Sequence, residues 1–507
     1  MTRTLAGHVG VRSVFVRSVF VRSVLLLAVA VGLVLGSAGS AAAHANLLST
    51  DPAEGAVLET APERVTFTFD ESVIGVPAGI KVFDATGAEI ASSASVDASR
   101  LFVDIDGEVP DGTLVVLWRL VSEDGHPIGG SLSFAVGAPS AVVDVSTTGA
   151  DADTDAPLLL VAVRAIGYLG LLVAAGAAVF SVLFLPRDVG ADTSRARLRP
   201  VVRVAAVVAV LAWWSAVPMI ALYQLGLPAS ALTEWSTWTA LAPAEYAVPA
   251  GVTLGLGLLV GALPARSAPG RARAALVLAG ALVALAAPAF TGHTRATSPE
   301  ALVMGVDVLH LVAGAVWLGG LVAIGTVLGE LARGDLGGVV LARFSTCAAG
   351  ALAVLVVAGS VLAWRIAGTW DALVDSGYGV VLLVKVLVAL VAVAIAGWNR
   401  YSLLPRLGEA SRSKDRRRVA ALLLRSTRAE AGVLVAVLLV TGVLVDRSPE
   451  VDGAAGVASG AGVTEDVRLG DISAELTLEP LAVGPNTLTI AMVDDAGEPT
   501  EGYGAPG

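Results

Sequence analysis

Eight long apolar stretches occupy the middle and later parts of the chain. Each is long enough to cross a hydrocarbon core of about 30 Å as a helix. A chain that crosses lipid must satisfy its own backbone hydrogen bonds, so helices are the expected structure. The pattern predicts an eight-helix transmembrane bundle over residues 157–446. The predicted spans are 157–185, 201–225, 244–263, 273–290, 301–328, 343–366, 378–398 and 429–446.

The segment from His44 to Gly137 has a different pattern, in which apolar and polar residues alternate. Runs such as Val65-Thr-Phe-Thr-Phe69 and Gly79-Ile-Lys-Val-Phe83 have the period of strands, and Pro, Gly and Asp separate them. Short strands at even spacing favour an immunoglobulin-like β-sandwich over residues 44–137. Residues 138–156, rich in Ser, Thr, Gly and Asp, then form a predicted linker.

The two ends of the chain carry further segments. Residues 1–43 combine arginines, an apolar run and a final Ala-Ala-Ala, which is the layout of a secretory signal peptide. Cleavage after Ala43 would make His44 the first residue. At the other end, a predicted linker over 447–465 precedes a β-rich segment over 466–507, which is short for a self-standing sandwich.

Composition narrows the class of protein. The 507 residues are 55% hydrophobic and 15% charged, whereas soluble domains have about 25% charged residues. This apolar composition indicates a protein of the lipid bilayer. The net charge of -11 argues against a nucleic-acid partner. A single cysteine, Cys347, excludes an intramolecular disulfide and a thiolate metal cluster, and its apolar neighbours predict a buried position.

Basic residues mark every second loop between the apolar stretches. Because Lys and Arg accumulate on the cytoplasmic side, these loops are expected inside the cell. The signal peptide independently places His44 outside. Together they predict a multi-pass protein of the cytoplasmic membrane whose two soluble segments are extracytoplasmic. The basic residues are Arg187, Arg195, Arg197, Arg199, Arg266, Arg271, Arg273, Arg333, Arg400, Arg406, Arg412, Lys414, Arg416, Arg417, Arg418, Arg425 and Arg428.

Two of the four histidines that follow the expected cleavage site lie in the alternating segment. A terminal His44 would offer an α-amine and an imidazole, both neutral near physiological pH. Asp124 and His126, in an Asp-Gly-His turn, would add a carboxylate and a second imidazole. This nitrogen and oxygen set suits tetragonal Cu(II) and is poor for Cu(I). The alternative from spacing alone is an ordinary turn sequence and an arbitrary first residue.

Ionisable residues also occur within the apolar stretches. Asp307 and His310 are three residues apart and share one helical face. With about 1.5 Å rise per residue, His310 lies on the order of 14 Å below the outer edge of its helix. Groups at that depth are candidates for function, and His293 precedes them in an outer loop. The simpler alternative is hydrogen bonding between helices; Lys385 and Glu430 are further candidates, with snorkelling or a structural ion pair as their simpler explanations.

The alternating segment resembles the CopC copper-binding domain over its whole length. The resemblance rests on His44-Ala-Asn-Leu-Leu-Ser-Thr-Asp-Pro-Ala-Glu-Gly55, Ser122-Glu-Asp-Gly-His-Pro-Ile-Gly-Gly130 and the stretch from Ala61 to Ser72. It implies that His44, Asp124 and His126 are Cu(II) ligands and that Glu71 lies just outside them. The family's methionine-rich Cu(I) segment has no counterpart, so the domain resembles the Cu(II)-only subtype.

The bundle is similar to CopD, the partner commonly fused behind CopC. Carrying the likeness are Asp307-Val-Leu-His-Leu-Val-Ala-Gly-Ala-Val-Trp-Leu-Gly-Gly320, Tyr378-Gly-Val-Val-Leu-Leu-Val-Lys385, Arg343-Phe-Ser345, Asn399-Arg400 and the stretch from Arg425 to Glu430. CopD proteins are implicated in copper uptake, and their metal-binding residues are less settled. The C-terminal segment resembles YtkA/FixH-like domains.

These patterns and resemblances predict outer-face copper binding and copper uptake along a path past His293, Asp307 and His310, without enzymatic activity. Sequestration of copper without import is the alternative. A copper-dependent oxidase with an N-terminal histidine brace is a third hypothesis, and haem bound by His293 and His310 is a fourth. Whether a periplasmic copper chaperone or a reductase is a protein partner is not decided by the sequence.

Overall fold

The computed structural model describes the chain from residue 45 onward with internal gaps. The residues outside the description are 1–44, 124, 141, 144–155, 188–190, 265–266, 332–335, 410–412, 446, 448–462, 470–471, 480–486 and 495–507, and the side chains of 77, 78, 293, 296, 331, 336, 413 and the C-terminal strands. The predicted signal peptide therefore lies outside the described residues, as do His44 and Asp124.

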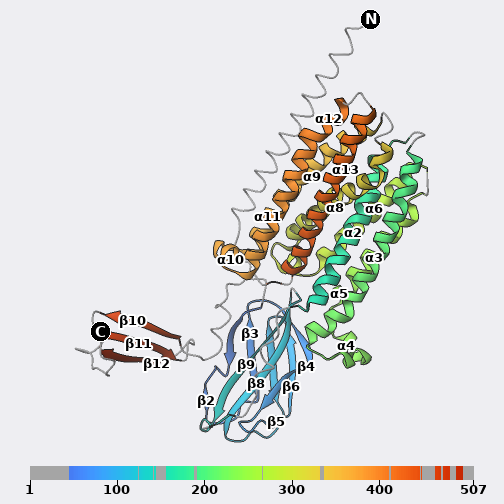
Figure 1. Cartoon of the computed structure of the whole chain (residues 1–507). Coiled ribbons are helices and arrows are strands. Elements are labelled where there is room, and N and C mark those ends of the chain that lie inside the picture. The colour runs from blue at the N-terminus through green and yellow to red at the C-terminus, as the bar shows by residue number, and fades with distance from the viewer. Residues whose placement is uncertain are drawn as a thin grey trace. The chain divides into compact units, whose positions relative to one another are not determined.

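Two mainly antiparallel sheets form the sandwich that precedes the helices (Figure 1). A four-stranded sheet has the order β1-β3-β7-β6, and a five-stranded sheet has the order β2-β9-β8-β4-β5, in which only the β2–β9 pair is parallel. The two-sheet fold predicted for this segment is confirmed. The strands are β1 (Leu47–Asp51), β2 (Val57–Leu58), β3 (Arg64–Phe69), β4 (Val73–Phe83), β5 (Glu89–Ile90), β6 (Ser92–Asp97), β7 (Arg100–Ile105), β8 (Gly112–Ser122) and β9 (Pro127–Val136).

The core of the sandwich follows from the alternation in its strands. In β3 the buried positions are Val65, Phe67 and Phe69, and the residues between them point outward. Trp118 of β8 packs between the sheets, with its ring centroid 6.0 Å from that of Phe67 and 5.4 Å from that of Phe69. The sandwich has its own buried apolar cluster, as an independent folding unit requires.

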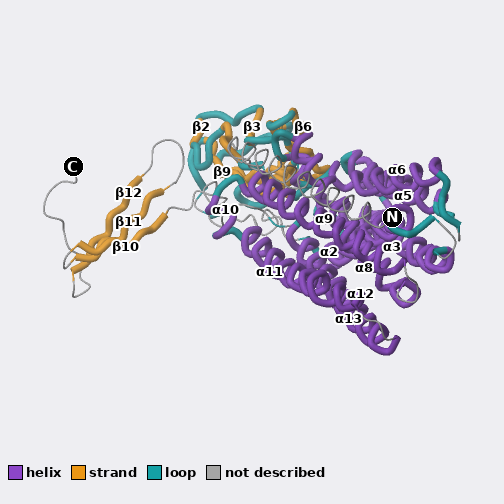
Figure 2. The backbone as a smooth tube through the Cα atoms, turned by 90° about the horizontal axis from the view of Figure 1, so that it is seen from above, coloured by secondary structure: helices purple, strands orange, loops and turns teal. Residues whose placement is uncertain are grey.

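Eight helices long and apolar enough to cross a membrane follow, as predicted (Figure 1). Figure 2 shows these helices lying alongside one another. The long helices are α2 (Leu158–Leu183), α3 (Asp192–Leu225), α5 (Pro243–Ala262), α6 (Arg271–Ala286, continued by η3, Ala287–Phe290), α8 (Glu300–Leu331), α9 (Leu336–Ala367), α11 (Gly377–Trp398) and α13 (Ser413–Leu444). Shorter elements are η2 (Ala229–Thr233), α4 (Trp235–Thr239), α7 (His293–Ala296), α10 (Trp370–Val374), the π-helix η4 (Asn399–Leu403) and α12 (Leu404–Glu409).

Two helices begin well before the apolar stretches that predicted them. Helix α3 begins at Asp192, and α13 begins at Ser413 within an arginine-rich segment. Arginine is a good helix former, so a helix that has left the hydrocarbon can continue through such residues. Hydropathy marks only the part of a helix that lies in lipid.

Helix α8 is central to the bundle, because it packs against α2, α9 and α13. It meets α2 through glycines: a Cβ atom on Gly319 would lie 2.6 Å from the Cα atom of Gly176. Gly280 of α6 makes a similar approach to α5, where a Cβ atom would lie 2.6 Å from the carbonyl oxygen of Gly255. Close contact of backbones through small residues is the usual way in which membrane helices associate.

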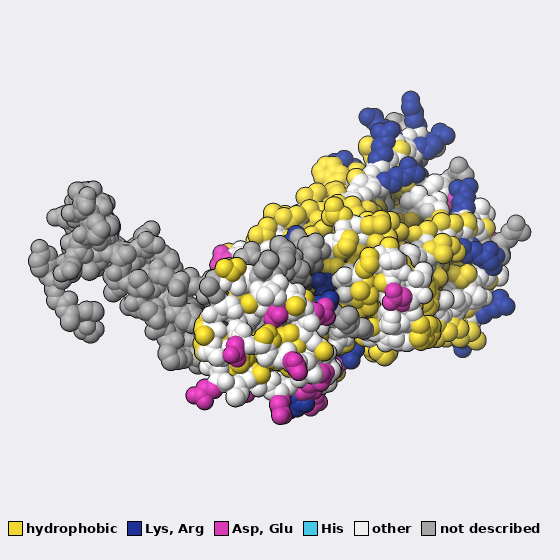
Figure 3. Space-filling model, turned by 90° about the horizontal axis from the view of Figure 1, so that it is seen from below, with side chains coloured by type: hydrophobic (Ala, Val, Ile, Leu, Met, Phe, Trp, Pro, Cys, Tyr) yellow, Lys and Arg dark blue, Asp and Glu magenta, His cyan; other side chains and the backbone are white. Residues whose placement is uncertain are grey.

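Charged side chains are distributed unevenly (Figure 3). Lys and Arg gather at one end of the helices, beyond a broad hydrophobic surface, while Asp and Glu are prominent on the sandwich. We call this end of the bundle, where α3, α6, α9 and α13 begin, the basic end. It is tied together by an ion pair of 2.9 Å between Arg197 of α3 and Glu330 of α8. Arg343 of α9 donates a hydrogen bond to the carbonyl of Leu183, at the end of α2.

Two expectations about single segments need correction. Cys347 of α9 is exposed at the bundle surface instead of buried, because lipid can surround an apolar stretch as well as protein can. The C-terminal part forms an antiparallel sheet in the order β10-β11-β12 (Val463–Leu469, Ile472–Glu479 and Thr487–Asp494). Strand β10 begins inside the range predicted as a linker.

Candidate metal site and membrane path

The strand pairing brings three segments to one end of the sandwich. Val73, at the start of β4, pairs with Ser122, at the end of β8. Leu47, at the start of β1, pairs with Phe69, at the end of β3. The residue after His44, the connection that contains Glu71 and the turn that contains Asp124 and His126 therefore lie at the same end. Each predicted ligand belongs to one of these segments.

The turn between β8 and β9 is fixed by its own hydrogen bonds. The amide and the hydroxyl of Ser122 both donate to the carbonyl of His126, at 2.9 and 3.0 Å. Gly125, with φ of +90°, donates its amide to the carbonyl of Ser122 at 3.0 Å. A positive φ favours glycine, which explains the middle residue of the Asp-Gly-His motif. His126 is held in a buried position, with 7% of its surface exposed.

The backbone at Asn46 is held by Asp70, a residue that the sequence-based site prediction did not include. The carboxylate of Asp70 accepts hydrogen bonds from the backbone amide of Asn46 at 2.7 Å and from its side-chain amide at 3.0 Å. In return, the amide of Asp70 donates to the Asn46 carbonyl at 3.1 Å. Asp70 thus fixes the backbone two residues after His44. The sequence feature that could have pointed to Asp70 is its position beside Glu71 in the CopC-like stretch.

The described residues contain no group of three or more His, Cys, Asp and Glu side chains placed to hold a metal. The predicted trio cannot appear in such a group, because His44 and Asp124 lie outside the described residues. Glu71 is half-buried in the connection between β3 and β4. The assignment of His44, Asp124, His126 and Glu71 to a copper site therefore stays a prediction.

In the bundle, Asp307 and His310 lie in the half of α8 that is farther from the basic end. The imidazole of His310 faces the Leu355 carbonyl of α9, and its Nδ1 atom is buried without a hydrogen-bond partner among the described residues. Gly359 of α9 leaves it room, since a Cβ atom there would lie 3.3 Å from the ring. Lys385 of α11 interacts electrostatically with Asp307 and His310. The structure thus groups Lys385 with the predicted pair.

His293 is the first residue of α7, just before α8, and its side chain lies outside the description. Whether it belongs with Asp307 and His310 stays a prediction. Neither snorkelling nor a structural ion pair accounts for Glu430. Only 3% of its surface is exposed, and it forms no ion pair with the described residues. Trp317 and Asn399 donate hydrogen bonds to it instead.

Three family descriptions match successive parts of the chain. "CopC domain" matches residues 47–137, "Copper resistance protein D-like, N-terminal domain" matches residues 152–303, and "Copper resistance protein D" matches residues 338–444. The first match covers the sandwich, and the other two cover most of the bundle.

Individual relatives agree with these matches. Copper resistance protein C of Escherichia coli is 37% identical over 117 residues, which cover 21% of this chain and 90% of that protein. Copper transport protein CutJ of Bacillus subtilis (strain 168) is 26% identical over 368 residues, 68% of this chain. The chain spans 65% of the length of CutJ. The crystal structure of CopC from Methylosinus trichosporium OB3b aligns with 19% of this chain and 95% of its own, at 28% identity and a TM-score of 0.17.

A β-sandwich of the CopC kind followed by eight apolar helices, each long enough to cross a membrane, is the architecture of the copper resistance protein families that match this chain. The chain belongs to the family in which a CopC domain is fused to a CopD bundle.

Proposed function

We propose that this protein captures Cu(II) at the outer face of the cytoplasmic membrane and carries copper inward through its helical bundle. The observation that carries the proposal is that the beginning of β1, the Glu71 connection and the His126 turn lie at one end of the sandwich. Two imidazoles, an α-amine and a carboxylate form a donor set that suits Cu(II).

The orientation rests on charge. The basic end would face the cytoplasm, because Lys and Arg are retained on that side of the membrane. Asp307, His310 and Lys385 then lie in the outer half of the bundle. Acidic side chains on the sandwich (Figure 3) would raise the local concentration of a metal cation.

The proposed path begins at His293 and continues to Asp307 and His310. Ionisable side chains within apolar helices are expected where a cavity or a transported ion passes them. A neutral imidazole is a good copper ligand, and Asp307 supplies a negative charge on the same face of α8. These groups favour import over sequestration at the surface, which requires none of them.

The first test is a Cu(II) titration followed by electron paramagnetic resonance on the segment from His44 to Gly137. One equivalent of Cu(II) should bind in a tetragonal nitrogen and oxygen environment, and His126→Ala should remove one nitrogen. Asp124→Asn should weaken binding less, since an amide oxygen can still approach the metal. Acid should release the metal as protons compete for the amine and the imidazoles.

The matched control adds one residue before His44, which turns its α-amine into a peptide bond. Affinity should fall sharply, because the chelate formed by the amine and the imidazole is lost. An unchanged spectrum and affinity in the extended version would rule out His44 as a chelating terminus. Import is tested separately by the copper content of cells, which should rise when the full chain is present and should stay the same if the protein only sequesters copper outside.

A further inference from the structure

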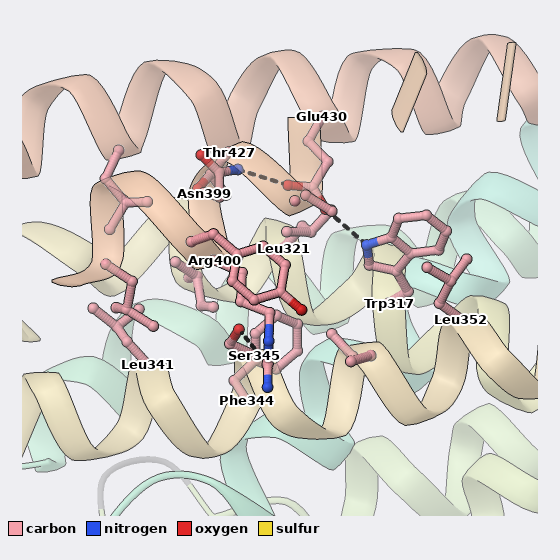
Figure 4. A pocket seen from close by; sticks show the side chains of 18 of the residues that line it. Trp317, Leu321, Leu341, Phe344, Ser345, Leu352, Asn399, Arg400, Thr427 and Glu430 are labelled. Carbon is pink, nitrogen blue, oxygen red and sulfur yellow. Dashed lines mark hydrogen bonds between the residues drawn. The ribbon is translucent and has the colours of Figure 1, made fainter. Parts of the chain in front are cut away.

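A half-open cavity of about 300 Å³ lies near the basic end of the bundle, between α8, α9, α11 and α13 (Figure 4). Most of its wall is apolar, and its polar groups come from Trp317, Ser345, Asn399, Arg400, Tyr401, Thr427 and Glu430. A mainly apolar cavity with a few convergent polar groups is the usual form of a binding site. Trp317 lies ten residues beyond Asp307 on α8, which corresponds to about 15 Å along the helix.

Glu430 is the acidic side chain of this cavity. Its Oε1 atom accepts a hydrogen bond of 2.7 Å from the indole N–H of Trp317, and its Oε2 atom accepts one of 2.8 Å from the side-chain amide of Asn399 (Figure 4). Both donors are neutral, so neither hydrogen bond brings a positive charge to the carboxyl group. An ionised Glu430 is costly to bury unless a cation compensates its charge, and in this cavity that cation is either the Arg400 guanidinium or a bound metal ion.

Asn399 adds a second ligand atom. Because its amide nitrogen is engaged by Glu430, its Oδ1 atom is held in a fixed orientation, and this atom is buried without a partner among the described residues. Asn399 begins the π-helix η4, which continues α11. Single π-turns within longer helices are frequent at functional sites. A carboxylate and an amide oxygen are both ligands for cations.

Arg400 gives the cavity a positive side. Its Nη1 atom donates a hydrogen bond of 2.8 Å to the hydroxyl of Ser345 on α9 (Figure 4). Arg400 forms no ion pair with Glu430 among the described residues. Its charge weakens the attraction that a cation feels in the cavity. Conduction requires a site that attracts an ion and also releases it.

We infer that this cavity is a second cation station on the copper path, with the Glu430 carboxylate and the Asn399 amide oxygen as its ligands. The inference rests on the proposed function and adds a station between the Asp307 and His310 pair and the basic end. Oxygen ligands suit Cu(II) and not Cu(I). The station is therefore proposed for Cu(II).

The test uses the full-length protein in liposomes that contain a copper-sensitive dye, with Cu(II) added outside. Glu430→Gln should lower the initial rate of Cu(II) entry by about tenfold or more, as losing a metal-supporting group commonly does. Glu430→Asp, which keeps the charge, should retain most of the rate. Glu330→Gln is the matched control: Glu330 is a partly buried acid at the same end of the bundle, paired with Arg197 and outside the cavity. It should stay within about twofold of the wild type.

The outcomes separate the inference from the proposed function. If the wild type moves no Cu(II), both fail. If the wild type moves Cu(II) and His310→Ala does not, but a folded Glu430→Gln variant keeps the full rate, the station is refuted and the proposed function stands. Folding is checked by a single elution peak and an unchanged Cu(II) spectrum of the outer domain. If Glu430→Gln does not fold, Asn399→Ala decides, since it keeps the carboxylate: a reduced rate supports the station, and an unchanged rate overturns it.

Discussion

Asp70 holds the backbone just before β1 to the end of β3, because its carboxylate receives two hydrogen bonds from Asn46. His44 is two residues before Asn46, so we expect its placement to depend on this contact. We expect Asp70→Ala to weaken Cu(II) binding by about fivefold, on the scale of roughly 1 kcal/mol for hydrogen bonds at an exposed position. Isothermal titration with a competing chelator measures the change.

Glu59→Ala is the matched control for this prediction. It removes an exposed carboxylate from the connection between β2 and β3, at the other end of β3 from Asp70. Its affinity for Cu(II) should equal that of the wild type. Equal losses in both variants would mean that overall charge matters and that the Asn46 contact does not.

Asp84 gives the sandwich a pH-dependent contribution to stability. Hydrogen bonds from the Thr86 hydroxyl and from the Ala88 amide hold the pKa of the Asp84 carboxyl below its ordinary value of 3.8. A carboxyl group whose pKa is lower in the folded than in the unfolded state stabilises the fold at every pH above its unfolded-state pKa. This contribution is lost as the pH falls through the folded-state pKa. Asp84→Asn should therefore lower the melting temperature at pH 7, and the difference should vanish in strong acid.

Thermal unfolding of the segment from His44 to Gly137 across this pH range checks the prediction. Asp97→Asn serves as the control, because the Asp97 carboxylate is exposed on β6 and makes no hydrogen bond with the described residues. A constant difference between wild type and Asp84→Asn at every pH would contradict the role of the carboxylate charge.

From the sequence, site residues could be proposed only where a short motif carried them. Asp124 and His126 stand in one turn motif, and Asp307 and His310 share one helical turn. Asp70 and Asn399 act through partners 24 and 31 residues away. Such contacts depend on strand pairing and helix packing, which spacing along the sequence does not reveal.

Helices α2 and α8 depend on glycine where they cross. A Cβ atom on Gly319 would meet the Cα atom of Gly176 at 2.6 Å and the carbonyl of Leu172 at 2.7 Å. Gly319→Val should therefore push the helices apart and destabilise the bundle, by about 1–3 kcal/mol or more for overpacking. Thermal aggregation of the purified protein, followed by size-exclusion chromatography, measures the loss.

Gly325→Val, on the same helix, has open space around the new side chain and should leave the aggregation temperature unchanged. If both variants behave alike, the loss comes from the helix propensity of valine and not from the contact between helices.

At the scale of elements, hydropathy predicted all eight long helices but placed the beginnings of α3, α9 and α13 too late. The beginning of α13 lies 16 residues before its predicted span, because arginine-rich turns remain helical outside lipid. The π-helix at Asn399 could not be predicted either, since its backbone shift depends on packing against α9 and α13.

The orientation of the whole molecule is the broadest prediction. Thiol labels on cysteines introduced near Ser140, Thr297 and Gly460 should react from outside intact cells, whereas positions in the loop from Arg406 to Arg418 should not. Permeabilised cells provide the control, because all four regions should then react. Outside access to the basic loop would reverse the orientation and the direction of transport.

Substitutions in the bundle should leave copper binding by the sandwich unchanged. His310→Ala and Asp307→Asn are expected to lower copper accumulation while Cu(II) binding to the outer domain stays unchanged, since the sandwich has its own core. Cellular copper content and a Cu(II) titration of the same variants measure the two properties. Normal accumulation in both variants would assign the pair to helix packing.

The exposed cysteine on α9 gives this protein a native attachment point. Cys347 is the single thiol of the chain, and it lies on the surface of the bundle. A nitroxide attached there and a paramagnetic Cu(II) bound to the sandwich would form a spin pair in the otherwise unaltered sequence. Pulsed electron paramagnetic resonance measures the distribution of distances between the two spins. A narrow distribution means that the sandwich is docked on the bundle, and a wide one means that it moves freely on its linker.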